Sequence, residues 1–109
     1  MKWAEQLGDN RAIADYIERL SPYEICKEQI EDEYIGCRAV LKWRALDTLI
    51  PGEPDINIVD EARQKVCDTT DLNSMPPLLV DGDKVADGNH RLRTLRKSNK
   101  THFWVYEIQ

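Results

Sequence analysis

The spacing of apolar residues predicts helices in the first third of the chain. Asp9 or Asn10 can cap a helix, and beyond them apolar positions recur at intervals of three and four residues. Ser21-Pro22-Tyr23-Glu24 has the form of a capping box, so a second helix is expected from there to Gly36. Residues 1–8 are expected to form a short helix or an ordered arm. The apolar stripes of the two helices are Ile13, Tyr16, Ile17 and Leu20, then Tyr23, Cys26, Ile30 and Tyr34.

After the second helix the pattern changes to strand-like alternation, with one helical stretch inside it. Two segments, one at the beginning and one at the end of this part of the chain, have side chains that alternate between two faces, which predicts strands. A proline-containing loop, a helix and a polar turn are expected after the first of these strands. The expected bounds are 38–46 and 101–108 for the strands, 49–54 for the loop, Asp55 or Asn57 to Cys67 or Asp68 for the helix, and 68–74 for the turn.

The stretch between that turn and the last strand predicts a β-hairpin. The apolar run at 78–80 reads as a strand, and residues 84–86 return as its partner. Asp81-Gly82 between them is a strong two-residue hairpin signal, because a type I′ turn needs positive φ and both residues tolerate it.

A helix is expected directly after the hairpin. Asp87-Gly88 breaks the second strand, and from Asn89 onward Leu92 and Leu95 follow helical spacing. A strand that turns through a glycine into a helix presents free backbone N–H groups and a partial positive charge at one point. The sequence therefore predicts an anion pocket at the start of this helix.

These elements define a fold class and a domain organisation. The 109 residues are predicted to form a single α+β domain, which buries roughly 65% of its unfolded surface. No linker or repeat divides the chain. A helical segment (1–37) is followed by a core of order β-α-β-β-α-β (38–109).

The charge is uneven along the chain. The formal net charge is −5 and residues 24–33 are acidic, so the molecule as a whole is disfavoured as a nucleic-acid binder. An acidic body with a local basic cluster suits a compact anionic ligand better than a long phosphate backbone. The basic cluster beside the expected pocket is Arg91, Arg93, Arg96, Lys97 and Lys100.

Cysteine usage and hydropathy indicate a cytoplasmic protein. Cys26, Cys37 and Cys67 are odd in number and form no Cys-x-x-Cys pair, which points to a reducing compartment and to small buried apolar side chains. No apolar run approaches the ~20 residues of a membrane span, and no signal peptide begins the chain, so no membrane partner is expected.

The motif Asp87-Gly88-Asn89-His90-Arg91 has a functional and a structural interpretation. In the functional one, backbone N–H groups, His90 and Arg91 bind phosphate oxygens, while Asp87 holds a metal ion, orients His90 or accepts a proton. In the structural one, Asp87 or Asn89 caps the helix, Gly88 supplies positive φ, and His90 and Arg91 face water.

The chain resembles the ParB/sulfiredoxin-like superfamily. The resemblance rests on 76–80 (Pro-Pro-Leu-Leu-Val), on 85–91 (Val-Ala-Asp-Gly-Asn-His-Arg) and on 104–106 (Trp-Val-Tyr), and it covers about 40–109. It implies a prokaryotic or phage protein that binds a nucleotide such as ATP, ADP or CTP with Mg²⁺. It is closest to the Asp-Gly-x-His-Arg subtype, in which phosphoryl transfer or nucleotide hydrolysis is expected.

The resemblance also assigns roles to residues. Glu53 lies in Ile50-Pro51-Gly52-Glu53 and matches the catalytic carboxylate of a Pro-x-Glu loop in the free-serine type of ParB-like kinase. Asn89 replaces the reactive cysteine of sulfiredoxins, and the Gly-Glu-Arg-Arg motif and helix-turn-helix of chromosome-partition ParB are absent. The implied sets are Glu53, Asp87 and His90 for catalysis, Gly88, Asn89, His90, Arg91 and Arg93 for phosphate, and Asp87 for nucleotide-borne Mg²⁺.

Two other classes of function remain open. One is a DNA-binding or nuclease module of ParB-like type, with base stacking on Phe103 and Trp104 as an alternative to a core position for these rings. The other is a non-enzymatic interaction protein of phage or mobile-element origin that binds a protein partner through its N-terminal helices. An exposed stripe of Tyr16, Tyr23 and Tyr34 would favour the latter.

Overall fold

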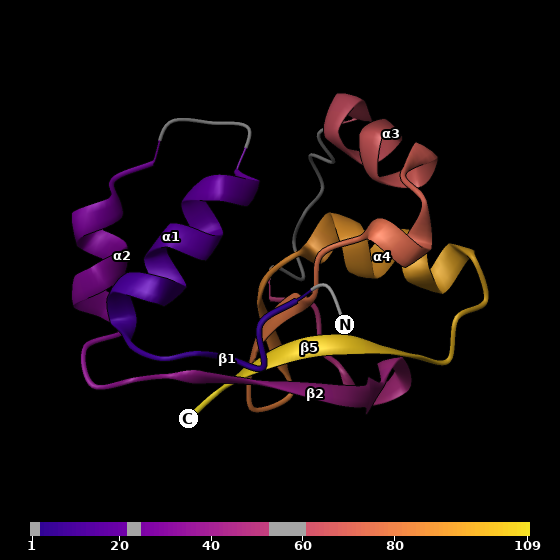
Figure 1. Cartoon of the computed structure of the whole chain (residues 1–109). Coiled ribbons are helices and arrows are strands. Elements are labelled where there is room, and N and C mark those ends of the chain that lie inside the picture. The colour runs from indigo at the N-terminus through magenta and orange to yellow at the C-terminus, as the bar shows by residue number, and fades with distance from the viewer. Residues whose placement is uncertain (1–2, 22–24, 53–60) are drawn as a thin grey trace.

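The fold is built around a sheet whose strands run in both directions. The computed structural model describes residues 3–21, 25–52 and 61–109. Over these residues the chain is an α+β domain with a five-stranded mixed sheet, ordered β1-β2-β5-β3-β4, and four α-helices (Figure 1). The strands are β1 (Gln6–Leu7), β2 (Ala39–Ala45), β3 (Leu78–Asp81), β4 (Lys84–Asp87) and β5 (His102–Ile108), and the helices are α1 (Asn10–Leu20), α2 (Lys27–Glu33), α3 (Glu61–Thr69) and α4 (Asn89–Lys97).

The strand pairing confirms the expected α+β class. β5 pairs antiparallel with β2 along its whole length and parallel with β3, and α4 makes the crossover between the parallel strands. β4 pairs antiparallel with β3 at one edge, and β1 pairs antiparallel with β2 at the other. The order from β2 onward is the predicted β-α-β-β-α-β. The strand β1 was not predicted as such, because two residues carry no periodic signal.

The β3–β4 hairpin turns one residue later than predicted. Asp81 pairs with Lys84, so the two turn residues are Gly82 and Asp83. Gly82 has φ of 62°, whereas Asp83 does not have positive φ. Positive φ at the first central residue alone is the pattern of a type II′ turn, which requires a glycine only there. The expected type I′ turn is therefore wrong, although the glycine that permits the hairpin was found.

The N-terminal helices form a pair beside the sheet. Asp9 caps α1 as predicted, and its Oδ1 accepts a hydrogen bond from the Ala12 N–H at 2.8 Å. Helix α2 is shorter than expected: it begins at Lys27, after an extended Cys26 that makes no side-chain cap. The capping box at 22–24 lies outside the described residues. Helix α2 is held against α1 by a hydrogen bond in which Asn10 Nδ2 donates to the Glu31 carbonyl oxygen at 2.8 Å.

Helix α3 ends close to its predicted end. Asp55 and Asn57, the predicted start, lie outside the described residues. The polar turn after it contains a single 3₁₀ turn at Leu72–Ser74. None of the helices in the described ranges has the length and apolar character that a membrane crossing requires.

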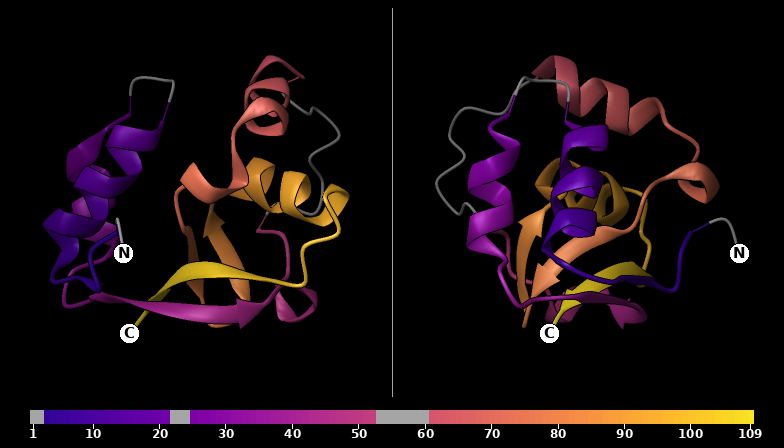
Figure 2. Two further views of the ribbon diagram at one scale, coloured as in Figure 1. Left: turned by 45° about the vertical axis from the view of Figure 1, so that its right-hand side comes forward. Right: turned by 60° about the vertical axis from the view of Figure 1, so that its left-hand side comes forward.

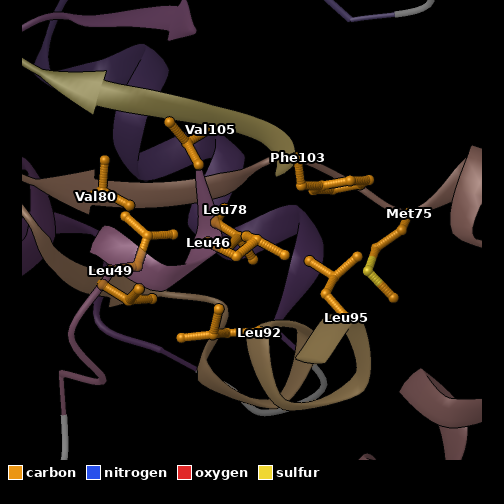
Figure 3. Close-up of a cluster of buried hydrophobic side chains, with 10 residues drawn as sticks. Leu46, Leu49, Met75, Leu78, Val80, Leu92, Leu95, Phe103 and Val105 are labelled. Carbon is orange, nitrogen blue, oxygen red and sulfur yellow. The ribbon is translucent and has the colours of Figure 1, made fainter. Parts of the chain in front are cut away.

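Strand β3 lies between two helical layers. The views in Figure 2 show α1 and α2 on one side of the β3–β4 hairpin and α3 and α4 on the other. Leu78 and Val80 belong to a buried cluster with α4, whereas Leu79 belongs to one with α1. Burial on both faces explains why β3 is continuously apolar. The cluster under α4, drawn in Figure 3, comprises Leu46, Leu49, Met75, Leu78, Val80, Val85, Leu92, Leu95, Phe103 and Val105.

Tyr16 fastens α1 to the sheet. Its side chain is 2% exposed, its ring meets Tyr106 edge to face at 5.0 Å, and its hydroxyl donates to the Pro77 carbonyl oxygen at 2.6 Å. Burial raises the pKa of Tyr16 well above its ordinary value of 10.0, against the lowering effect of nearby Arg91. Burial also raises the pKa of Tyr34, to about 12.

These tyrosines predict a loss of stability in alkali. A phenol whose pKa is higher in the folded state keeps its full stabilisation below its unfolded pKa, here about 10, and loses it as the pH rises further. Urea midpoints are therefore expected to be flat from pH 8 to 9.5 and to fall above pH 10. The Tyr16→Phe variant should have a free energy of unfolding about 1 kcal/mol lower at pH 8, because the hydrogen bond is missing. Above pH 10 its stability should fall less steeply than that of the wild type. Parallel declines of the two proteins above pH 10 would contradict this assignment.

Candidate functional site

The candidate site lies where β4 turns into α4. Gly88 is the N-cap of the helix and has φ of 106°, in the left-handed region. A Cβ added there would lie 2.8 Å from both Leu78 Cδ2 and Arg91 Nη2. The position therefore requires glycine for its backbone conformation and for its close contacts. The helix begins at Asn89, as predicted, and its N-cap residue, Gly88, makes no side-chain capping hydrogen bond.

Arg91 points into the protein. The residue is 7% exposed, and its Nη1 donates to the carbonyl oxygens of Pro76 at 3.0 Å and Pro77 at 2.8 Å. Its Nη2 donates to Asp87 Oδ2 at 3.0 Å, four residues earlier at the end of β4. The guanidinium thus ties the segment before β3 to the end of β4 and the start of α4. The solvent-facing Arg91 of the structural interpretation is therefore wrong, and the direct phosphate contact of the functional interpretation stays a prediction.

His90 is held by a residue that the sequence did not single out. Its Nδ1 lies 3.0 Å from Oε1 of Gln64 on α3, which is 6% exposed. The two N–H groups of the Gln64 amide have three acceptors within reach of Nε2: the carbonyl oxygen of His90 at 3.2 Å, Thr94 Oγ1 at 2.9 Å and Asp68 Oδ1 at 3.0 Å. Because the amide oxygen is then the acceptor, the histidine is assigned as the Nδ1–H tautomer.

Asp68 completes this α3–α4 network. The Thr94 hydroxyl donates to Asp68 Oδ1 at 2.7 Å, and Lys97 Nζ lies 3.2 Å from Oδ2. Hydrogen bonds from Thr94 and Gln64, and then the contact with Lys97, hold the pKa of Asp68 below its ordinary value. Sequence alone offered the i,i+4 spacing of Gln64 and Asp68 as a signal, but nothing in it related Gln64 to a histidine 26 residues away.

Asn89 faces a pocket on the other side of the helix start. Its Oδ1 accepts a hydrogen bond from the Gly52 N–H at 2.9 Å, and a Cβ at Gly52 would overlap the Val85 carbonyl oxygen. The pocket has a volume of about 520 Å³ and lies between the edge of β4, α2 and the end of β5. Its lining residues are Glu33, Tyr34, Cys37, Gly52, Asp81, Lys84, Val85, Ala86, Asn89, Ile108 and Gln109.

The remaining predicted site residues are not gathered here. Glu53, the expected catalytic carboxylate, lies outside the described residues, directly after Gly52. Arg93 is exposed on α4 and does not line the pocket. Arg96 donates to the carbonyl oxygens of Leu46 and Leu49, so part of the expected basic cluster is bound to the protein itself.

Metal ligands and cysteines were also predicted. Within the described ranges no group of three or more His, Cys, Asp or Glu side chains is placed to hold a metal ion, and Mg²⁺ at Asp87 stays a prediction. No disulfide joins the three cysteines, all of which lie in the described residues. They are not the buried apolar side chains that were expected, since Cys26 is exposed and Cys37 and Cys67 are half-buried.

Fold and site together define a class: an α+β domain with a mixed sheet and a helix that starts at a glycine N-cap beside a pocket. Comparison with known proteins adds no relative, since no family model, no curated protein and no solved structure matches this chain. The ParB/sulfiredoxin resemblance therefore rests on the motif and the order of elements.

Proposed function

We propose that this chain is a ParB/sulfiredoxin-like domain that binds a nucleotide at the start of α4. The observation that carries the proposal is the pocket of about 520 Å³ at Asn89, beside the start of a helix whose N-cap residue, Gly88, makes no side-chain capping hydrogen bond. Helix N-termini favour anions through their N–H groups and partial positive charge. Lys84 on the same wall adds a full positive charge. The volume is in the range of ordinary small-ligand sites.

The charges on the wall favour a nucleotide that arrives with a divalent cation. Glu33 and Asp81 also line the pocket, and bare phosphate would be repelled by both carboxylates. Mg²⁺ is usually bound by one or two carboxylates together with substrate phosphates, so these side chains fit a Mg²⁺–nucleotide complex. When bound, Mg²⁺ would neutralise phosphate charge.

The motif residues divide into contact and support roles in this proposal. Gly88 and Asn89 present backbone N–H groups, and the Gln64 contact orients His90 at the helix start. Arg91 and Asp87 hold the β4–α4 junction from inside, where their ion pair is formed. The geometry supports binding best. Phosphoryl transfer or hydrolysis needs a base in addition, for which Glu53 remains the candidate; release of inorganic phosphate that Glu53→Gln abolishes would establish it.

Asn89→Asp is the sharpest test of binding. The aspartate keeps the acceptor for the Gly52 N–H, and a carboxylate in the first turn favours the helix, so stability should be unchanged or slightly higher. The same charge repels phosphate, so nucleotide affinity should fall at least about tenfold. A thermal-shift panel of CTP, ATP, ADP and GTP, each with and without Mg²⁺, identifies the ligand first. A nucleotide at ~100 times its Kd stabilises by about 2.7 kcal/mol, a shift of several degrees.

Gln29→Glu is the matched control, because it adds the same charge at an exposed position of α2 that does not line the pocket. Its affinity should equal that of the wild type. No shift with any of the four nucleotides, or equal binding by Asn89→Asp and the wild type, would refute the proposed site.

The alternative of a docking surface on the N-terminal helices loses its main support. Of its three tyrosines, Tyr16 is buried, Tyr34 is half-buried, and Tyr23 lies outside the described residues.

A further inference from the structure

All three tryptophans of the chain line a single pocket at the opposite end of α4. Trp3 precedes β1, whereas Trp43 of β2 and Trp104 of β5 are directly paired across the sheet. The pocket has a volume of about 210 Å³. Phe103 and Met75, from the core cluster under α4, form part of its wall. Rings from three separate parts of the chain therefore meet at one surface site.

Much of the Trp43 side chain at this pocket is exposed to solvent. Trp43 is 56% exposed, although a tryptophan is among the side chains that gain most from burial. Its ring meets Trp104 edge to face at 5.0 Å and 66°, and lies parallel to the His102 ring at 6.2 Å and 9°. These neighbours fix the orientation of Trp43 while leaving much of it in water. The expected core position is confirmed for Phe103, but Trp104 is only half-buried.

The charges at the pocket distinguish between possible ligands. The chain has 20 acidic residues, yet no aspartate or glutamate is among the residues that line this pocket, whereas Lys100 and His102 are. A neighbouring hollow of about 410 Å³ shares these two residues and adds Arg96, Asn99 and one carboxylate, Asp47. An ammonium ligand would find aromatic faces but no counter-charge, and Lys100 would repel it. A flat ring joined to an anionic group fits both features.

We propose that this Trp43–Trp104 pocket binds a nucleobase by stacking, with the attached phosphate held by Lys100. The shared ligand chemistry is a base joined to a phosphate, supplied either by a free nucleotide or by a single-stranded nucleic acid. Aromatic platforms beside a basic side chain bind single strands with little sequence preference, because every base has a π-face. A duplex hides these faces in its own stack and does not fit. The pocket is distinct from the nucleotide site proposed at Asn89.

Intrinsic fluorescence provides a direct test, because every tryptophan of the chain lies at the pocket. Thymidine monophosphate, a ten-nucleotide oligothymidylate, a duplex of the same length and a proline-rich peptide would each be titrated into the wild type. Quenching by the single strand, by the mononucleotide or by both supports the site and identifies the source. No quenching by either, equal affinity for the duplex, or quenching by a proline-rich peptide alone would overturn the proposal.

Variants locate the interaction. Trp43→Ala should weaken binding of a fluorescently labelled oligothymidylate about tenfold or more by anisotropy, whereas Ile35→Ala, another exposed apolar side chain outside the pocket, should not. Lys100→Glu should make the slope of log K against log salt concentration less steep by about one unit. Lys65→Glu on α3 should leave that slope unchanged. Asn89→Asp should bind the oligonucleotide normally, so the two proposals fail or succeed separately. Unchanged affinity in both Trp43→Ala and Lys100→Glu would refute the site.

Discussion

Replacing Arg91 with methionine is expected to lower the free energy of unfolding by about 3–5 kcal/mol, the usual effect of removing one partner of a buried ion pair. The guanidinium is 7% exposed and makes hydrogen bonds to Asp87 and to the carbonyl oxygens of Pro76 and Pro77. Methionine fills a similar volume but leaves these acceptors without a donor, and Asp87 without its counter-charge. The melting temperature should fall by roughly 10 °C or more, and urea denaturation measures the free energy directly.

Arg93 provides the matched control, because it lies two residues away on the same helix and is exposed. Arg93→Met should change stability by no more than about 0.5 kcal/mol. The double variant Asp87→Asn, Arg91→Met should recover part of the loss, since no charge is then left unpaired. Equal stability of the two single variants at positions 91 and 93 would show that the Arg91 contacts contribute nothing to the fold.

Gly88→Ala is expected to destabilise the domain by about 2–4 kcal/mol. An L-residue is strained at φ of 106°, which accounts for roughly 1–3 kcal/mol. In addition, the new methyl group would lie 2.8 Å from Leu78 Cδ2 and Arg91 Nη2, so the core or the ion pair must shift. Chemical denaturation measures the total effect.

Two other glycines separate these contributions. Gly82 has a positive φ of 62°, but a Cβ added there would have no atom within 4 Å. The loss of stability in Gly82→Ala, about 1 kcal/mol, therefore measures the backbone strain alone. Gly8→Ala has neither feature and should be nearly neutral. If Gly88→Ala were no worse than Gly82→Ala, the close packing behind the helix start would be refuted.

Arg91 also shows why the site was harder to predict than the fold. Gly88 and the spacing of Leu92 and Leu95 predicted the helix that contains it, but whether the Arg91 side chain faces solvent or protein depends on the segment before β3. Those carbonyl oxygens come from residues 14 and 15 positions earlier in the chain. A pattern of neighbouring residues carries no information about a contact over such a distance in the sequence. The same holds for Gln64 and His90, which meet only because α3 packs on α4.

Local sequence determined the elements of this protein, because periodicity, caps and glycines act within a few residues. Asp9 began α1, the apolar run at 78–80 made β3, and Gly88 separated β4 from α4. Tertiary structure alone decided which side chains meet. Contacts with Pro76, Pro77 and Asp87 hold Arg91 inward, and pairing of β2 with β5 placed Trp43 beside Trp104. The physical reason is that burial and long-range hydrogen bonds are set by neighbours distant in sequence, which no local pattern encodes.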